Sequence, residues 1–155
     1  MSYAQETSVP VERSRAEIER ILTRYGADRF MVGSDKHRAV LCFEVKGRMV
    51  QFDLPLPDRM EKKFWFTPAR GSKRSETEAF KEWEQACRSR WRALRLCIQA
   101  KLEAVEVGIT SFESEFLAHF VMHDGKTLGQ HIIPKLDQAI GGQPALPWFG
   151  QQANK

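Results

Sequence analysis

A row of basic side chains on one predicted helix is the part of this 155-residue sequence with the clearest chemistry. Lys81, Arg88, Arg92 and Arg95 are spaced so that, at about 100° per residue, they share one edge of the helix beside its apolar face. No acidic residue interrupts the row after Arg88. Arginine presents a planar fork of N–H donors that suits phosphate oxygens. The spacing therefore predicts a line of phosphate contacts.

The polar connection predicted for residues 58–74 adds aromatic rings to these bases. The triplet Phe64-Trp65-Phe66 is surrounded by five basic residues, which are Lys62, Lys63, Arg70, Lys73 and Arg74. Bases interleaved with aromatic rings suit single-stranded nucleic acid, where each stacked base contributes roughly 1–3 kcal/mol. We expect Trp65 to stack on a base and four cations to extend the line of phosphate contacts, namely Lys62, Lys63, Lys73 and Arg74. The alternative is that the rings belong to the core and the arginines pair with glutamates from elsewhere.

The charge of the chain is unevenly distributed. The net charge is +4, but the segment 59–101 has twelve bases and five acids, so it carries +7 and the rest of the chain −3. Such an asymmetry within one domain is typical of a surface that binds a polyanion. A basic surface that is merely solvated has the same composition, so this alternative stays open.

A second group of residues suggests metal chemistry. Glu44-Val45-Lys46 is an E-x-K triplet at the end of a predicted strand, with Asp35 upstream. This is loosely similar to the PD-(D/E)xK nucleases, in which two carboxylates hold a metal that activates water. However, no proline precedes Asp35, which lies in a predicted turn, and the triplet falls on the second strand instead of the third.

Further motifs for catalysis or metal binding are weak. Glu115, His119 and His123 share a helix face only if that helix continues to residue 123, and the Asp124-Gly125 turn predicts an earlier end. There is no nucleophile elbow and no phosphate-cradling glycine loop. We therefore predict no catalytic residue, no metal and no cofactor, and a binding protein in preference to an enzyme.

Composition limits the class of protein. The length allows one compact domain, and 42% hydrophobic residues with ten Phe and four Trp provide a core. The sequence has no apolar run of the length that a membrane span needs and no secretion signal at its start. Three widely spaced cysteines, Cys42, Cys87 and Cys97, favour reduced thiols in a cytoplasm.

The predicted elements give an α+β fold in one domain over residues 10–142, between a mobile tail at 1–9 and a C-terminal tail at 143–155. A capping box at Ser14–Glu17 predicts the start of a first helix that ends at Gly26. Three strands rich in β-branched and aromatic residues follow between Arg29 and Leu54, as an antiparallel meander.

The second half of the sequence predicts helices. Ser75 and Glu78 form a capping box, and no Gly or Pro follows until Gly108, so one helix of about 30 residues is expected. A capping box at Thr110 and Glu113 predicts a short helix, and Thr127 predicts the start of a last helix through about Ile140.

Four segments of the chain resemble a widespread group of uncharacterised bacteriophage and prophage proteins. They are LPLPDR at 54–59, RWRAL at 90–94, KLEAVEVG at 101–108 and FESEFLAH at 112–119. The likeness covers about residues 9–135 and implies a viral gene product in a bacterial cytoplasm, with no catalytic residues to transfer. The order helix, three-stranded meander, helix is also similar to phage single-strand annealing proteins and to double-stranded RNA-binding domains, as an analogy of fold.

These observations together predict a phage protein that binds nucleic acid, with single-stranded DNA as the expected partner, in recombination or replication. The alternative is a phage protein that inhibits or redirects a host factor, and a metal-dependent nuclease is a weaker one. The apolar tail around Trp148-Phe149 predicts a homo-oligomer. No membrane partner is expected.

Overall fold

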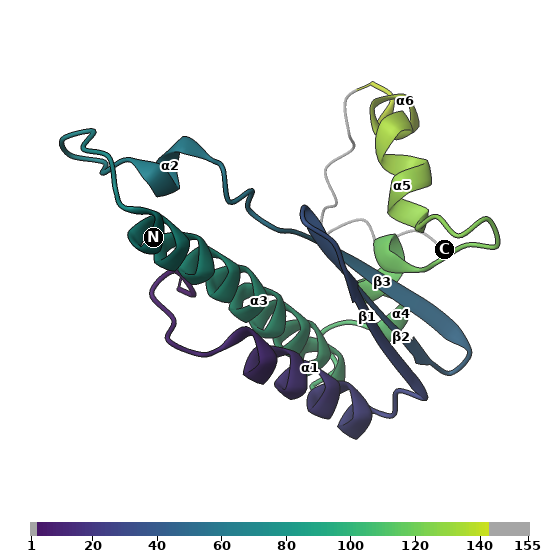
Figure 1. Ribbon diagram of the computed structural model, residues 1–155. Coiled ribbons are helices and arrows are strands. Elements are labelled where there is room, and N and C mark those ends of the chain that lie inside the picture. The colour runs from purple at the N-terminus through teal and green to yellow at the C-terminus, as the bar shows by residue number, and fades with distance from the viewer. Residues whose placement is uncertain (1–2, 143–155) are drawn as a thin grey trace, which may run out of the picture.

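The computed structural model of this protein describes residues 3–142 and has an α+β fold, as predicted (Figure 1). Helices and strands follow one another as α1 (Val11–Tyr25), β1 (Arg29–Ser34), β2 (Arg38–Val45), β3 (Arg48–Pro55), α2 (Lys62–Trp65), α3 (Glu76–Glu106), α4 (Phe112–Phe116), α5 (Leu128–Ile132) and α6 (Leu136–Ile140). Two 3-10 turns, η1 (Leu117–His119) and η2 (Ile133–Lys135), follow α4 and α5.

The three strands form the predicted antiparallel meander, in the order β1-β2-β3. Leu41 in the central strand pairs with Val32 on one side and Phe52 on the other. The tight turn between β2 and β3 has positive φ at Lys46 (51°) and Gly47 (74°), which is the backbone of a two-residue hairpin that follows the twist of the strands. Beyond β3, the backbone N–H of Val121 donates to the Met49 carbonyl at 2.9 Å. The later chain is thereby attached to the sheet edge.

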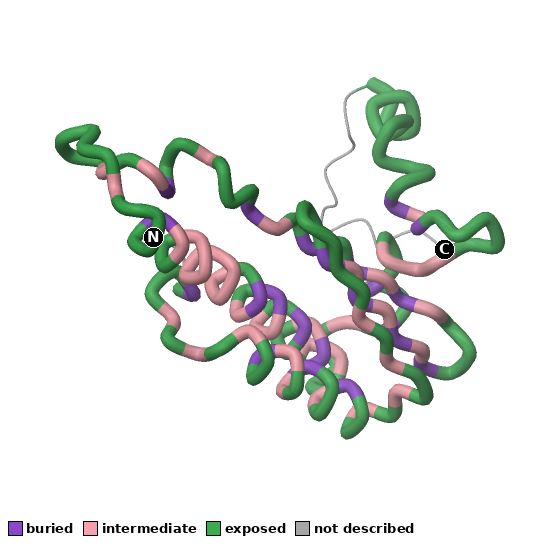
Figure 2. Tube along the Cα trace, in the orientation of Figure 1, coloured by how far each residue is buried: buried purple, intermediate pink, exposed green. Residues whose placement is uncertain are grey.

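One face of the sheet and three helices enclose the core. Burial alternates along β2, so Leu41 and Phe43 are buried while their neighbours are partly exposed. Ile18 of α1 and Ile98 of α3 pack in the same core, and Phe116 of α4 meets the Phe43 ring edge-on, with centroids 5.9 Å apart. Figure 2 shows the buried positions along the strands and along the half of α3 that α1 accompanies.

The long helix α3 extends beyond the elements that cover it. Its 31 residues span about 46 Å, whereas the 15 residues of α1 span about 22 Å. Trp91 and Ile98 on its apolar face are buried, but Phe80, Trp83 and Cys87, on the same face nearer its start, are only partly buried. The first third of α3 therefore carries an apolar face that the sheet does not cover (Figure 2).

Most predicted helix boundaries are confirmed. Ser75 and Glu78 form the predicted capping box, and α3 runs without interruption to Glu106. Thr127 accepts from the backbone N–H of Gln130 and caps α5. The last predicted helix is divided into α5, η2 and α6, but it ends at Ile140 as expected.

Two capping predictions are wrong. Helix α1 begins at Val11, so Ser14 lies inside the helix, where its hydroxyl is buried without a hydrogen-bond partner among the described residues. The short helix α4 is capped by Ser111, whose side chain accepts from the Ser114 backbone N–H, and not by the neighbouring Thr110. In both places an apolar residue that must face the core, Val11 or Phe112, sets where the helix starts.

Residues 3–9, predicted as part of a mobile tail, lie against α3. Ala4 is buried, and the Gln85 side-chain amide donates to the backbone carbonyls of Gln5 and Thr7, at 3.1 and 2.8 Å. These hydrogen bonds hold the start of the chain across the long helix.

The helical segment from α5 to α6 projects from the body of the protein (Figure 1). Its large apolar side chains are exposed, namely Ile132, Ile133, Leu136 and Ile140. The tail at 143–155, on which the prediction of a homo-oligomer rests, lies outside the described residues. Within residues 3–142, no helix has the length and apolar character to cross a membrane.

Replacing Phe116 with alanine should destabilise the fold strongly. Its ring is fully buried between the rings of Phe43, Phe52 and Phe112, so the substitution leaves a cavity that costs about 3–5 kcal/mol. Urea unfolding followed by circular dichroism measures the change. The control is Ile109→Ala, because Ile109 is 79% exposed and its loss should change the free energy of unfolding by about 0.5 kcal/mol or less. Equal effects of the two substitutions would contradict this assignment of the core.

Candidate nucleic-acid interface

Residues 56–75, which we call the basic arm, connect β3 to α3 and cover the start of the long helix. The Trp83 indole N–H of α3 donates to the Pro57 carbonyl at 2.8 Å, and the Phe64 ring of α2 is buried. The arm extends past the first turn of α3 before the chain enters that helix (Figure 1). It therefore stands at the end of the molecule opposite α5 and α6.

Arg74 holds the arm in shape. Its Nη1 donates to three backbone carbonyls, those of Lys63 at 3.0 Å, Phe64 at 3.2 Å and Phe66 at 2.9 Å. Its own backbone N–H donates to the Trp65 carbonyl at 2.7 Å. This guanidinium, predicted to contact phosphate, is thus engaged by the arm itself.

Trp65 and Lys63 are also engaged within the arm. The indole N–H of Trp65 donates to the Arg59 carbonyl at 3.0 Å, and its ring is half-buried. The Lys63 ammonium lies 2.6 Å from a Glu61 carboxylate oxygen, and this interaction holds the pKa of Glu61 below its ordinary value. Both side chains therefore support the arm, with part of the Trp65 ring left at the surface.

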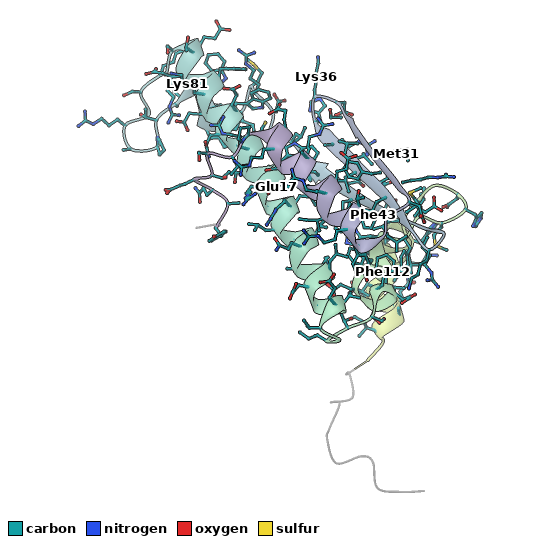
Figure 3. All side chains as sticks on the ribbon, turned by 90° about the horizontal axis from the view of Figure 1, so that it is seen from below. Glu17, Met31, Lys36, Phe43, Lys81 and Phe112 are labelled. Atoms are coloured by element: carbon teal, nitrogen blue, oxygen red, sulfur yellow. The ribbon has the colours of Figure 1, made fainter. Side chains whose placement is uncertain are left out.

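Four bases are exposed and project from the arm and the start of α3. They are Lys62, Lys73 and Lys81 of the predicted line, together with Arg70, which the prediction did not include among the phosphate contacts. Within the described part of the chain, none of them has a carboxylate oxygen within 4.0 Å. Figure 3 shows Lys81 near one end of the long helix, away from the sheet. These cations are available to a polyanion.

Arg92 and Arg95 face α1 instead of solvent. Arg92 Nη1 lies 2.7 Å from Glu17 Oε2, and Arg95 Nε lies 3.0 Å from the same oxygen. The two arginine side chains are only 22% and 19% exposed. Glu17 lies between the two helices (Figure 3). This pairing is the alternative left open by the sequence, and it makes these arginines part of the contact between α1 and α3.

Glu17 is held ionised by its partners. Burial raises the pKa of this carboxyl, but hydrogen bonds from Arg92 and Arg13 and the charges of Arg92 and Arg95 outweigh that effect. The pKa therefore lies below its ordinary value. The carboxylate supplies the negative charge that brings two guanidinium groups of α3 against α1.

A cleft opens where the first third of α3, which the sheet does not cover, faces the start of α1 and the β1–β2 turn. Its volume is 1080 Å³. Its walls are the start of α1, the turn between β1 and β2, the beginning of the arm, and one face of α3 that includes Trp83, Glu84, Cys87, Arg88 and Trp91. Lys36 marks the β1–β2 turn in Figure 3. The cleft is the continuation of the core beyond the end of the sheet.

Charged groups of both signs line the cleft. Arg15, Lys36 and Arg88 have no carboxylate within 4.0 Å among residues 3–142, and Arg88 instead donates to the Gln85 side chain. The Arg15 guanidinium lies 5.5 Å from the centre of the Trp91 ring. Three acids of the cleft, Glu12, Asp58 and Glu84, likewise have no cation partner in the described chain.

Cys87 lies in the wall of the cleft and is half-buried. Burial raises the pKa of its thiol, and the negative charge of Glu84 adds to the effect. Cys42 and Cys97 are also free, and neither lines the cleft.

Comparison with known proteins gives no identification. No family model, curated protein or solved structure matches this chain. Its function is therefore inferred from the residues and their arrangement.

The residues of the nuclease alternative do not come together. Asp35 accepts from the backbone N–H groups of His37 and Arg38 in the β1–β2 turn, whereas Glu44 pairs with Arg29 near the opposite end of β2. Arg38 and Glu44 are six positions apart along β2, which is about 20 Å. Across residues 3–142, no group of three or more His, Cys, Asp or Glu side chains is placed to hold a metal ion.

The histidine candidates are likewise separated. The helix stops before His123, as the turn at Asp124-Gly125 predicts. Glu115 pairs with Lys101, and the His119 ring stacks on Phe52 with centroids 4.0 Å apart. Burial lowers the pKa of His119, which favours the neutral ring.

Sequence reasoning missed the cleft because its walls come from four segments that are distant in the chain. Arg15 and Lys36 gave no local signal, since each is one basic residue among many. The available signal was the apolar face of α3, which continues to Phe80 and Trp83, farther than a helix as short as α1 covers.

Replacing Glu17 with glutamine should lower stability in a pH-dependent way. Because the pKa of Glu17 is lowered in the folded protein, its carboxylate stabilises the folded state at any pH above 4.5, the ordinary pKa of this group. This contribution is lost as the pH falls through the lower pKa of the folded state. At pH 7 we expect the free energy of unfolding to fall by about 1–3 kcal/mol, between the values for exposed and fully buried ion pairs. Urea unfolding from pH 7 to pH 3 measures it.

The control is Glu19→Gln, because Glu19 is exposed on the same helix and pairs with no cation of the described residues. It should change stability little at any pH. A deficit of Glu17→Gln that stays constant down to pH 3 would show that the ion pairs do not cause it.

Proposed function

We propose that this protein binds single-stranded nucleic acid, with single-stranded DNA as the partner, through the basic arm and the first half of α3. One observation carries the proposal. Of the twelve bases between Arg59 and Lys101, six have no carboxylate partner among the residues described, and all six lie on the arm or between Lys81 and Arg90. They are Lys62, Arg70, Lys73, Lys81, Arg88 and Arg90. Cations concentrated in this way attract a polyanion, and each phosphate neutralised releases condensed counterions.

An exposed ring beside these cations favours unpaired bases over a double helix. Phe66 is 40% exposed on the arm, next to Lys73 across a β-bridge. A ring of this kind stacks on the face of a base only where that face is accessible, as it is in a single strand. Phe66 therefore supports the stacking role that the sequence assigned to Trp65, whose ring is half-buried.

The resemblance to bacteriophage proteins indicates the process in which this binding would take part. A phage protein that binds single strands would act in recombination or replication of viral DNA in the bacterial cytoplasm. Binding without chemistry is the form we propose, because the acidic residues of the nuclease alternative are separated.

The alternative partner is an acidic surface of a host protein. The exposed apolar side chains of the α5–α6 segment favour a protein contact elsewhere on this chain, because a row such as Ile132, Leu136 and Ile140 is typical of association surfaces. The basic arm offers the same charge to an acidic protein as to DNA, so a direct binding measurement is needed to distinguish them.

Binding of a labelled single-stranded oligonucleotide should weaken steeply with salt, and neutralising the arm should reduce that dependence. We expect the change of Lys62, Arg70, Lys73 and Lys81 to glutamine to lower the slope of log affinity against log salt by about 0.7 for each phosphate that the protein no longer neutralises. Fluorescence anisotropy at several salt concentrations measures both affinity and slope.

The matched control removes the same charges elsewhere, by changing Arg20, Lys46, Lys126 and Lys135 to glutamine, all exposed residues outside the arm. This control should keep most of the affinity and the slope. Wild-type affinity that is absent at low salt, or insensitive to salt, would refute the proposal. Retention of an acidic host protein without DNA binding would support the alternative, and cleavage of the oligonucleotide that requires Mg²⁺ would support a nuclease.

A further inference from the structure

We propose that the cleft between α1, α3 and the β1–β2 turn receives one unstacked base of the strand that the basic arm binds. This inference rests on the proposed function and deepens it, because it assigns a base-binding site that the arm alone does not provide. The cleft volume of 1080 Å³ is slightly above the range of about 300–1,000 Å³ for small-molecule sites, so a nucleotide fits with room for water.

The cleft continues the path of the arm. Arg59 and Met60, at the beginning of the arm, line it, and so does Arg88, which shares one edge of α3 with the exposed Lys81, about two turns farther along the helix. A strand whose phosphates follow Lys73 and Lys81 thus reaches the mouth of the cleft without leaving the surface. The arm and the cleft form one continuous surface at the end of α3 that the sheet does not cover.

Three cations of the cleft are free to contact the phosphate of such a nucleotide. Arg15 comes from α1, Arg88 from α3 and Lys36 from the β1–β2 turn, so three elements each bring a cation to a lining that also holds the acids Glu12, Asp35, Asp58 and Glu84. None of the three cations has a carboxylate within 4.0 Å in the described residues, so a phosphate would not displace an existing ion pair. Charge-assisted hydrogen bonds from guanidinium to phosphate are among the stronger polar contacts.

The interior of the cleft is suited to a base. The half-buried Trp83 and Cys87, together with Met60 at the rim, supply apolar surface, while Trp91 is only 4% exposed and forms the floor. Glu84, which has no cation partner in residues 3–142, supplies a carboxylate that accepts N–H donors. Cytosine presents such a donor in its exocyclic amino group, whereas thymine presents a carbonyl oxygen at the same position. The cleft should therefore prefer cytosine to thymine.

The test obstructs the cleft by alkylating the thiol of Cys87. In a Cys42→Ser, Cys97→Ser background, Cys87 is the one remaining thiol, and alkylating it in the folded protein places a bulky group in the wall of the cleft while the residues of the arm stay unchanged. Anisotropy then compares alkylated and free protein on oligo(dC), oligo(dT) and an oligo(dC) with a central abasic site. The control is a Cys42→Ser, Cys87→Ser protein alkylated at the exposed Cys97.

We expect alkylation at Cys87 to lower affinity for oligo(dC) about fivefold or more, the effect of removing one stacked base, and alkylation at Cys97 to leave it unchanged. The abasic oligonucleotide should bind the free protein with the same reduced affinity. Glu84→Gln should remove the preference for oligo(dC) over oligo(dT), while Glu103→Gln, on the exposed side near the other end of α3, should keep it.

The outcomes separate this inference from the function on which it rests. If wild-type protein binds no oligonucleotide, the proposed function fails. If it binds through the arm but alkylation at Cys87, the abasic site and Glu84→Gln all have no effect, the function stands and the cleft proposal is overturned. Protection of Cys87 from alkylation by a peptide, but not by oligo(dC), would also overturn it and assign the cleft to a protein segment.

Discussion

The burial of one long apolar helix face by shorter elements determines the rest of this structure. The sheet, α1 and α4 cover α3 from Trp91 onward, where Ile98 and Leu102 are buried in the core. They do not reach Phe80, Trp83 and Cys87. Because water-exposed apolar surface is unfavourable, the chain covers this end of the helix with the arm and with residues 3–9, and the space left between them is the cleft.

The charges of α3 follow the same division. Where α1 packs against the helix, arginines are neutralised by Glu17, because a guanidinium placed between two helices needs a partner charge. Where α1 and the sheet do not cover α3, Lys81 and Arg90 face solvent without a partner in the described chain. One helix edge that looks uniform in sequence thus serves packing at one end, while the other end presents free cations.

The sequence predicted elements better than it predicted the site. Strand alternation and the Ser75–Glu78 capping box depend on neighbours in the chain, so they predicted the meander and the full length of α3. Ser14 misled the prediction because its type favours a cap although tertiary packing places it inside a helix. The pairing of Arg92 with Glu17 joins residues that are 75 positions apart, and no local pattern encodes such a contact. The cleft could not be predicted for the same reason, because its walls come from four segments that are distant in the chain.

The hydrogen bonds of the arm allow it to unfold separately from the sheet. Arg74 and Trp65 donate to carbonyls between Arg59 and Phe66, and Trp83 reaches back to Pro57, so these hydrogen bonds close small loops and involve little of the core. A segment held in this way unfolds as a cooperative unit of its own, at a lower free energy than the sheet. Amide hydrogen exchange in the arm would therefore report local opening, while the strands would exchange only when the whole domain unfolds.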